Sequence, residues 1–206
     1  MQTSTALFEA EKQPGSITKV LDAACSVDAS ACSDYMARAS ARLAVECRGE
    51  LEAGQPRVTQ ARVGLGAYGA VRAATCLRDG GGYCFVRAVS NLTDPSDSYL
   101  FLMPLGMPLP RGSTPSCDAC TRRVMAAYHA AAAGSDPRLR VLYGDGAGRI
   151  NGVCGAGFVN GTVPRAERSA AAAAAGGRGA GRRGGWTVLV AWAGLAAVGA
   201  AAFGIA

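Results

Sequence analysis

Residues 29–51 read ASACSDYMARASARLAVECRGEL, and this stretch carries the clearest signal of the fold class of the chain. Its apolar side chains recur every three or four residues, at Cys32, Met36, Ala39, Leu43 and Cys47. The charged residues Arg38, Arg42 and Glu46 fall on the opposite side of a helical wheel. This helical period predicts an amphipathic helix over the whole stretch.

More helices are expected from the same periodicity, at residues 16–25, 56–76, 117–134 and 139–154. Ser16 is the expected cap of the first of these, and Ser116 or Thr114 is the expected cap of the third. Pro56 is acceptable in the first turn of a helix. We expect the glycines at 144, 146 and 148 to break or loosen the last helix.

The segments between these helices lack the long alternation that marks a strand. Residues 79–82 read DGGG, which predicts a turn, and an apolar run at 83–89 leads to a second loop at 91–97. Prolines exclude a regular helix over residues 99–107, so we expect an extended, packed loop there. Because no period-two run of β-branched residues is long enough to propose a sheet, the expected fold is all-α.

Eight cysteines lie in this helical part, and none lies in the last 52 residues of the chain. All are disulfide candidates: Cys25, Cys32, Cys47, Cys76, Cys84, Cys117, Cys120 and Cys154. An even number confined to one domain is typical of an oxidising compartment and predicts a small, disulfide-stapled helical domain. Eight cysteines allow 105 pairings, so we predict only that Cys76 and Cys84, beside the glycine turn, lie near each other.

Three local patterns suggest chemistry, and each has a simpler structural explanation. The CDAC sequence at 117–120 could be a redox pair or half of a zinc site, but the other cysteine spacings favour structural bridges. GLGAYG at 64–69 matches a dinucleotide-binding fingerprint, but it falls inside a predicted helix, where close helix packing explains it. Asp94 and Asp97 are expected to cap a loop rather than to form a pair of catalytic carboxylates.

The chain has one histidine, His129, which we expect either in solvent or at the edge of the core. A catalytic triad would need a positioned nucleophile and a third group, and the sequence indicates neither. We therefore predict no catalytic, cofactor-binding or metal-binding residue.

Two N-glycosylation acceptors are present, Asn91-Leu92-Thr93 and Asn160-Gly161-Thr162. Each lies among glycine, proline, serine or aspartate residues, so each is expected on an exposed loop. Together with the cysteines they favour a lumenal or extracellular location.

The formal charge of +6 does not indicate a nucleic-acid partner. Up to residue 164 the chain has 16 basic and 14 acidic residues, whereas the segment from residue 165 has five arginines and one glutamate. The excess charge therefore belongs largely to the C-terminal segment, and the helical part shows no basic face with interleaved aromatic residues.

The composition divides the chain into three parts, at 1–164, 165–185 and 186–206. The first is the cysteine-rich helical domain, and the second is an Ala/Gly/Arg linker with too little apolar surface to fold. The third carries no charge, and 21 helical residues span about 30 Å, the thickness of the hydrocarbon core of a bilayer. We expect this tail to be a hydrophobic helix that attaches the protein to a membrane.

Two attachment mechanisms fit the tail. Cleavage of a glycosylphosphatidylinositol (GPI) signal needs small residues, a polar spacer and a hydrophobic end, and Ala174 or, with a longer spacer, Ser169 meets these needs. A retained transmembrane helix is the alternative, and the arginines at 178, 182 and 183 favour it, because basic flanks tend to stay in the cytosol. We weigh the sequons and cysteines above this flank and favour the lipid anchor.

The order of several short motifs resembles that of a known family. The motifs are LDAAC at 21–25, ATCL at 74–77, YCF at 83–85, PSDSY at 95–99, PLG at 104–106, CDAC at 117–120 and FVN at 158–160. They resemble an uncharacterised family of fungal cysteine-rich proteins that are secreted or GPI-anchored at the cell surface. The resemblance implies a helical cysteine-rich domain with a lipid-anchor tail, and it brings no catalytic residue.

Residues 1–13 have neither a basic region nor an apolar run of a signal peptide. Members of the family that the chain resembles have a signal peptide and a further cysteine-containing segment before the counterpart of Phe8. We therefore expect the natural N-terminus to lie upstream of Met1.

These observations favour a structural or interaction module on the outer face of a fungal plasma membrane or in its cell wall. Its expected partners are the membrane and a wall polysaccharide or protein, without a cofactor. One alternative is a surface enzyme whose loop at 91–99 lines a cleft. Another is a cytosolic, single-pass, tail-anchored protein with free thiols.

Overall fold

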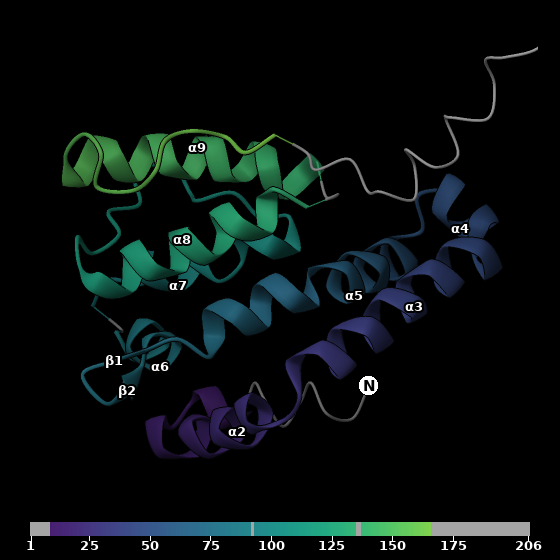
Figure 1. The fold of residues 1–206 in the computed structure, drawn as a ribbon, viewed down its shortest axis with the longest axis horizontal. Helices are drawn as coiled ribbons and strands as arrows, with labels where there is room; N and C mark the ends of the chain where they lie inside the picture. Colours follow the sequence, from purple (N-terminus) through teal and green to yellow (C-terminus); the bar gives the residue numbers. More distant parts are fainter. Residues whose placement is uncertain (1–8, 92, 135–136, 166–206) are drawn as a thin grey trace, which may run out of the picture. The chain divides into compact units, whose positions relative to one another are not determined.

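The computed structural model describes residues 9–91, 93–134 and 137–165, and this part of the chain is mainly helical (Figure 1). The helices are α2 (Pro14–Ser26), α3 (Ala29–Glu46), α4 (Arg48–Glu52), α5 (Pro56–Thr75), α6 (Cys84–Ser90), α7 (Ser96–Leu100), α8 (Ala119–Ala132) and α9 (Pro137–Cys154). A 3₁₀ turn, η1 (Met103–Leu105), and two short strands, β1 (Arg78–Asp79) and β2 (Gly82–Tyr83), complete the described elements. The expected helical class is confirmed.

The long helices pack in the order α3, α5, α8 and α9, each against the next (Figure 1). Helix α8 lies in the middle of the core, where its side chains Val124, Met125 and Tyr128 have at most 1% of their surface exposed. Leu100, Met103, Tyr143 and Ile150 from neighbouring elements complete the most deeply buried cluster. Helix α3 contributes no buried residue, so it stands outside this core.

The predicted turn at 79–82 is part of a β-hairpin, which corrects the expectation of no strands. Arg78 pairs with Tyr83 and Asp79 with Gly82 in antiparallel register. Gly80 and Gly81 both have positive φ, 58° and 88°, as a tight two-residue hairpin turn requires. Strands of two residues are too short to show the alternation on which sequence analysis depends.

Two of the expected caps are replaced by other residues. Helix α2 begins at Pro14, with Gln13 at the N-cap, rather than at Ser16. The cap of α8 is Asp118, whose carboxylate accepts a hydrogen bond of 2.9 Å from the backbone N–H of Thr121. Ser116 does not cap this helix, because its backbone N–H and its hydroxyl both donate to the Asp97 carboxylate.

The proline-rich segment at 99–107, expected to be extended, is largely helical. It forms the end of α7 and the η1 turn, and Pro104 lies within the first two positions of η1. This arrangement is permitted because the first positions of a helix do not need a backbone N–H. The apolar run at 83–89 is also helical and forms most of α6.

Helix α9 is continuous through the glycines at 144, 146 and 148, so the expected break is absent. A Cβ atom at Gly146 would lie 2.7 Å from the Cε atom of Met103, and one at Gly144 would lie 2.9 Å from Cγ2 of Val163. These two glycines make room for neighbouring side chains, whereas Gly148 has open space beside it. Packing therefore explains two glycines that look like helix breakers in the sequence.

The helix expected over residues 29–51 is present but interrupted. Helix α3 ends at Glu46, Cys47 has non-helical backbone angles of −112° and 37°, and the short α4 follows. The expected hydrophobic tail, and all of the expected linker except Arg165, lie outside the described residues.

Candidate functional site

Three disulfides join elements that are far apart in the sequence. They are Cys25–Cys76, Cys84–Cys120 and Cys117–Cys154, with Cα–Cα distances of 5.7, 5.4 and 5.3 Å. The first links the last turn of α2 to the end of α5, the second links α6 to α8, and the third links the segment before α8 to the end of α9. Every long helix of the core is therefore held by a covalent bond.

The two remaining disulfide candidates, Cys32 and Cys47, have no partner sulfur within this chain. Both lie at α3, the helix that is outside the core, and both are partly exposed. Burial raises the pKa of the nearby Tyr68 hydroxyl, and its interaction with the Cys32 thiol raises it further.

The β1–β2 hairpin lies between Cys76 and Cys84 in the sequence. The backbone N–H of Cys84 donates to the carbonyl of Leu77 at 2.9 Å, so the turn brings the two segments together. The two cysteines nevertheless have different partners, because Cys25 in α2 and Cys120 in α8 approach them from outside the hairpin. The CDAC pair, Cys117 and Cys120, likewise forms two separate bridges and no bridge of its own.

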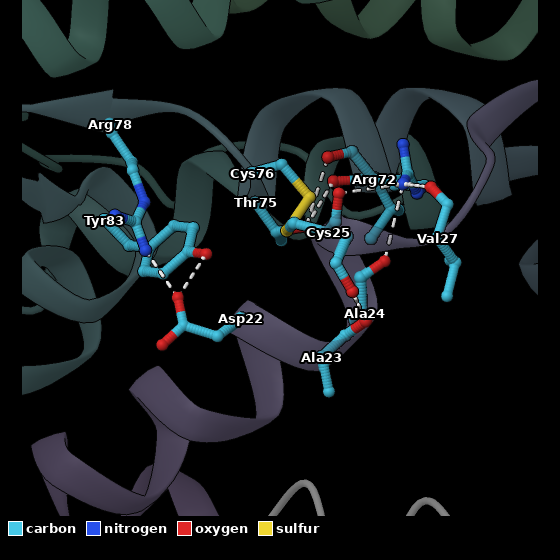
Figure 2. Close-up of a disulfide and its surroundings, with 12 residues drawn as sticks. Asp22, Ala23, Ala24, Cys25, Val27, Arg72, Thr75, Cys76, Arg78 and Tyr83 are labelled. Atoms are coloured by element: carbon cyan, nitrogen blue, oxygen red, sulfur yellow. Dashed lines mark hydrogen bonds and ion pairs between the residues drawn. A yellow bond between two sulfur atoms is a disulfide. The ribbon is translucent and has the colours of Figure 1, made fainter.

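The Cys25–Cys76 disulfide lies beside a set of polar contacts that fix the end of α2 (Figure 2). The guanidinium of Arg72 donates to the carbonyls of Ala24, Cys25 and Val27, at 3.4, 3.3 and 2.5 Å. The last carbonyls of a helix have no partner within the helix, so a cation there supplies both hydrogen bonds and favourable charge.

A second contact in Figure 2 joins α2 to the hairpin. The Asp22 carboxylate accepts from Arg78 at 2.5 Å and from the Tyr83 hydroxyl at 2.9 Å. Arg78 also lies over the Tyr83 ring, 4.0 Å from its centroid. Asp22 is more than 50 residues from both partners in the sequence, and no local pattern could have indicated these contacts.

The carboxylates expected to cap a loop do so. Asp94 accepts from the backbone N–H of Ser96 at 2.9 Å and from the Thr114 hydroxyl at 3.2 Å. These hydrogen bonds, with Ser96 the larger cause, lower the pKa of Asp94. Because the Asp97 carboxylate is also engaged, by Ser116, both acids hold the segment before α8 against α7.

Polar groups converge on one small cavity beside the Cys84–Cys120 disulfide. Its lining includes Arg87, Asp97, Asp118 and Thr121, and its volume is about 20 Å³. Arg87 binds Asp118 of this lining at 2.5 Å, and it also binds Asp79, outside the lining, at 3.2 Å. A water molecule needs about 10–15 Å³, so the cavity has room for one water and not for a sugar or a peptide.

The fingerprint glycines, Gly64, Gly66 and Gly69, lie in the middle of α5, as expected. The expected close packing holds only weakly, since a Cβ at Gly69 would be 3.9 Å from the Ser33 hydroxyl and the other two have open space. The element before α5 is the helix α4, so the strand–turn–helix context of a phosphate-binding loop is missing. Over residues 9–91, 93–134 and 137–165, no three acidic, histidine or cysteine side chains gather as a metal site would require.

The second sequon lies beside the histidine. His129 is half-buried, and its Nε2 atom is 3.1 Å from both the Thr162 carbonyl and the Asn160 amide nitrogen. Asn160 itself is exposed, and its Oδ1 atom accepts from the backbone N–H of Thr162 at 2.9 Å. Asn91 is half-buried at the end of α6, and its Oδ1 atom accepts from the backbone N–H of Asp94.

The candidate attachment residues Ser169 and Ala174 lie outside the described residues, as does the hydrophobic tail. Among the helices that the structure does describe, none combines the length and the apolar character needed to cross a bilayer.

No curated protein and no solved structure matches the chain. A protein family matches residues 1–163, the part of the chain that contains all eight cysteines. The chain therefore belongs to the family described as Domain of unknown function (DUF7729).

Proposed function

We propose that residues 1–164 form an extracellular structural or interaction module, attached to the outer face of a fungal plasma membrane or to its cell wall. The observation that carries this proposal is the set of three disulfides that link α2 to α5, α6 to α8 and the segment before α8 to α9. Such bonds form and persist in oxidising compartments and are rare in the cytosol.

The disulfides also suit a protein that must stay folded outside the cell. They close loops of 36 to 51 residues, and a loop of that size is worth about 4 kcal/mol in the chain-entropy model. The gain arises mainly because the unfolded chain loses freedom.

The exposed sequon at Asn160 supports the same location. Its amide faces the solvent in a segment without helix, where an N-linked glycan could be attached without displacing the core. The first sugar would be joined to Nδ2 of Asn160, 3.1 Å from Nε2 of His129, which is itself only half-buried.

Membrane attachment is assigned to residues 186–206, either as a signal exchanged for a lipid anchor at Ala174 or Ser169 or as a retained transmembrane helix. The Gly- and Arg-rich residues before this tail would then act as a tether between the module and the membrane. A wall polysaccharide or a surface protein is the partner to which such an arrangement would present the module.

The mode of membrane attachment is tested on the protein in its native cells. The intact cells are treated with phosphatidylinositol-specific phospholipase C, and the released and retained fractions are measured by immunoblot. Release supports the lipid anchor, and retention on the surface of intact cells supports the transmembrane helix. A protein that protease cannot reach until the cells are opened would contradict the extracellular location and would support the cytosolic, tail-anchored alternative.

Glycosylation is tested in the same cells with two substitutions of one residue. Thr162→Ala removes the acceptor at Asn160, and Thr162→Ser preserves it, so only the first variant should lose one glycan and migrate faster than the parent on a gel. If enzymatic deglycosylation changes the gel migration of neither the parent nor either variant, Asn160 carries no glycan. That result would contradict the location proposed from this sequon.

A further inference from the structure

Helix α3 is incompletely covered by the rest of the domain. It has 18 residues and none of them is buried, while Tyr35 and Val45 keep 62% and 68% of their surface exposed. An open groove of about 460 Å³ runs between α3 and α5. A helix of this length in a folded domain normally buries one side completely, so α5 covers α3 only in part and leaves surface for a further packing partner.

The two free thiols lie at this same helix. Cys32 and Cys47 are 15 residues apart, which corresponds to about 22 Å along the axis. A disulfide needs Cα atoms within about 4.4–6.8 Å, so the two thiols of one chain cannot bond to each other. The other six cysteines of the given sequence are already paired, so Cys32 and Cys47 are available to bond to sulfur atoms outside this set of eight.

The thiols share one side of α3 with small and apolar residues. Cys47 lines an open groove of about 240 Å³ together with Ala39, Arg42, Leu43 and Glu46, all of them from α3. Cys32 precedes Ala39 by seven residues, which returns it to the same side of the helix. The groove beside Cys47 is accessible from outside, because no residue of α5 lines it, whereas Cys32 at the other end of the stripe also interacts with Tyr68 of α5.

The spacing of the thiols fits a second copy of the chain. When two α3 helices lie antiparallel about a twofold axis between residues 39 and 40, Cys32 of each copy faces Cys47 of the other. In the same register Met36 faces Leu43, and the small residues Ala39 and Ser40 meet at the axis. Small side chains there allow the helix axes to approach to about 8 Å, as an interhelical disulfide needs.

We propose that this protein is a homodimer joined by two symmetric disulfides between Cys32 of one copy and Cys47 of the other, across antiparallel α3 helices. Each bridge forms when two thiols give up two protons and two electrons to a disulfide oxidant, such as oxidised glutathione or an oxidised dithiol enzyme. The oxidant leaves as two thiols, so two bridges consume two oxidant disulfides. The proposal rests on the oxidising location proposed above.

Peptide mapping without reduction tests the pairing. The full-length protein is extracted from its native cells with N-ethylmaleimide and is digested with trypsin and Asp-N. These enzymes release Cys32 in fragment 28–33 and Cys47 in fragment 43–48, each with a single cysteine. A covalent 28–33 to 43–48 product is expected, and it can only join two chains.

Single substitutions distinguish the antiparallel dimer from other arrangements. Cys32→Ser alone, or Cys47→Ser alone, should remove both bridges and abolish the covalent dimer on a non-reducing gel. In a parallel dimer the remaining cysteine would still face its own copy, and the covalent dimer would persist. The control Ala41→Ser, at an exposed site of α3, should leave the dimer unchanged.

Complementation provides the sharpest outcome. Cells that express the Cys32→Ser and Cys47→Ser chains together, with different epitope tags, should form a covalent dimer that contains both tags and one bridge. Absence of this mixed dimer, alkylated Cys32 and Cys47 in the parent, or a bond from either to an unrelated polypeptide would overturn the proposal.

The same digest distinguishes failure of the dimer from failure of the oxidising location. If the three intrachain disulfides are found while Cys32 and Cys47 carry N-ethylmaleimide, the dimer is wrong and the oxidising location stands. If all eight cysteines are alkylated, the location is wrong as well.

Discussion

Replacing Gly146 by alanine should destabilise the domain, although alanine favours helices. A Cβ atom at this position would lie 2.7 Å from Cε and 3.3 Å from Sδ of Met103, a side chain with no exposed surface. Because Met103 is fully buried, its flexible end can shift only against other core side chains, and the added methyl group overpacks the core at a cost of about 1–3 kcal/mol. The gain in helix propensity is about 1 kcal/mol, which leaves a net loss of up to about 2 kcal/mol.

Gly148 provides the matched control in the same helix. A Cβ atom there would have no neighbour within 4 Å, so Gly148→Ala should show only the propensity gain of about 1 kcal/mol. The difference between the two variants therefore isolates the packing cost, about 1–3 kcal/mol. Urea denaturation followed by circular dichroism measures it as a shift of the midpoint at constant slope.

A double-mutant cycle identifies the clashing partner. Met103→Ala alone should destabilise the domain by about 2–5 kcal/mol, and part of this loss should be recovered when Gly146→Ala is added, because the new methyl group enters the vacated space. Equal stability of the Gly146→Ala and Gly148→Ala variants, or strict additivity in the cycle, would show that contact with Met103 is not the source of the cost.

Three further predictions concern the core, one disulfide and the effect of pH. The Tyr128 hydroxyl is buried without a hydrogen-bond partner among the residues that the structure describes, so Tyr128→Phe should raise the free energy of unfolding by about 1 kcal/mol in urea titrations. Tyr143→Phe, which loses a hydrogen bond to the Asn160 carbonyl, should lower it by a similar amount. Replacing Cys25 and Cys76 together by alanine should cost about 4 kcal/mol, and an unchanged thermal midpoint would contradict this loop-closure argument. Because hydrogen bonds lower the pKa of Asp94 in the folded state, its contribution is present above the unfolded pKa of about 4 and is lost as the pH falls through the lower folded value. Acid titration of stability should therefore show a smaller loss for Asp94→Asn than for the parent protein.

The helices could be predicted because their evidence is local. Apolar residues at helical spacing indicated α3, and Pro56 marked the start of α5. Errors arose where the deciding contact was distant in the sequence. The glycines of α9 look like breakers until Met103 is known to pack against one of them, and Ser116 looks like a cap until Asp97 is seen to bind it.

The disulfide pairing could not be predicted, for the same reason. Cys117 and Cys120 are three residues apart, yet the packing of α6 and α9 against α8 gives each a different partner. The free thiols were also missed, because Cys32 and Cys47 have the same spacing signature as core residues, and only the position of α3 outside the core separates them from the rest. No sequence pattern indicates that Arg72 binds the end of α2, since the carbonyls to which it donates are 45 to 48 residues away.

The most decisive measurement is the disulfide map of the protein taken from its own cells, with thiols trapped by alkylation before lysis. We expect linked peptides for Cys25–Cys76, Cys84–Cys120 and Cys117–Cys154 in nearly every molecule, as an oxidising location requires. Recovery of these six cysteines as alkylated thiols, without prior reduction, would contradict the proposed extracellular module.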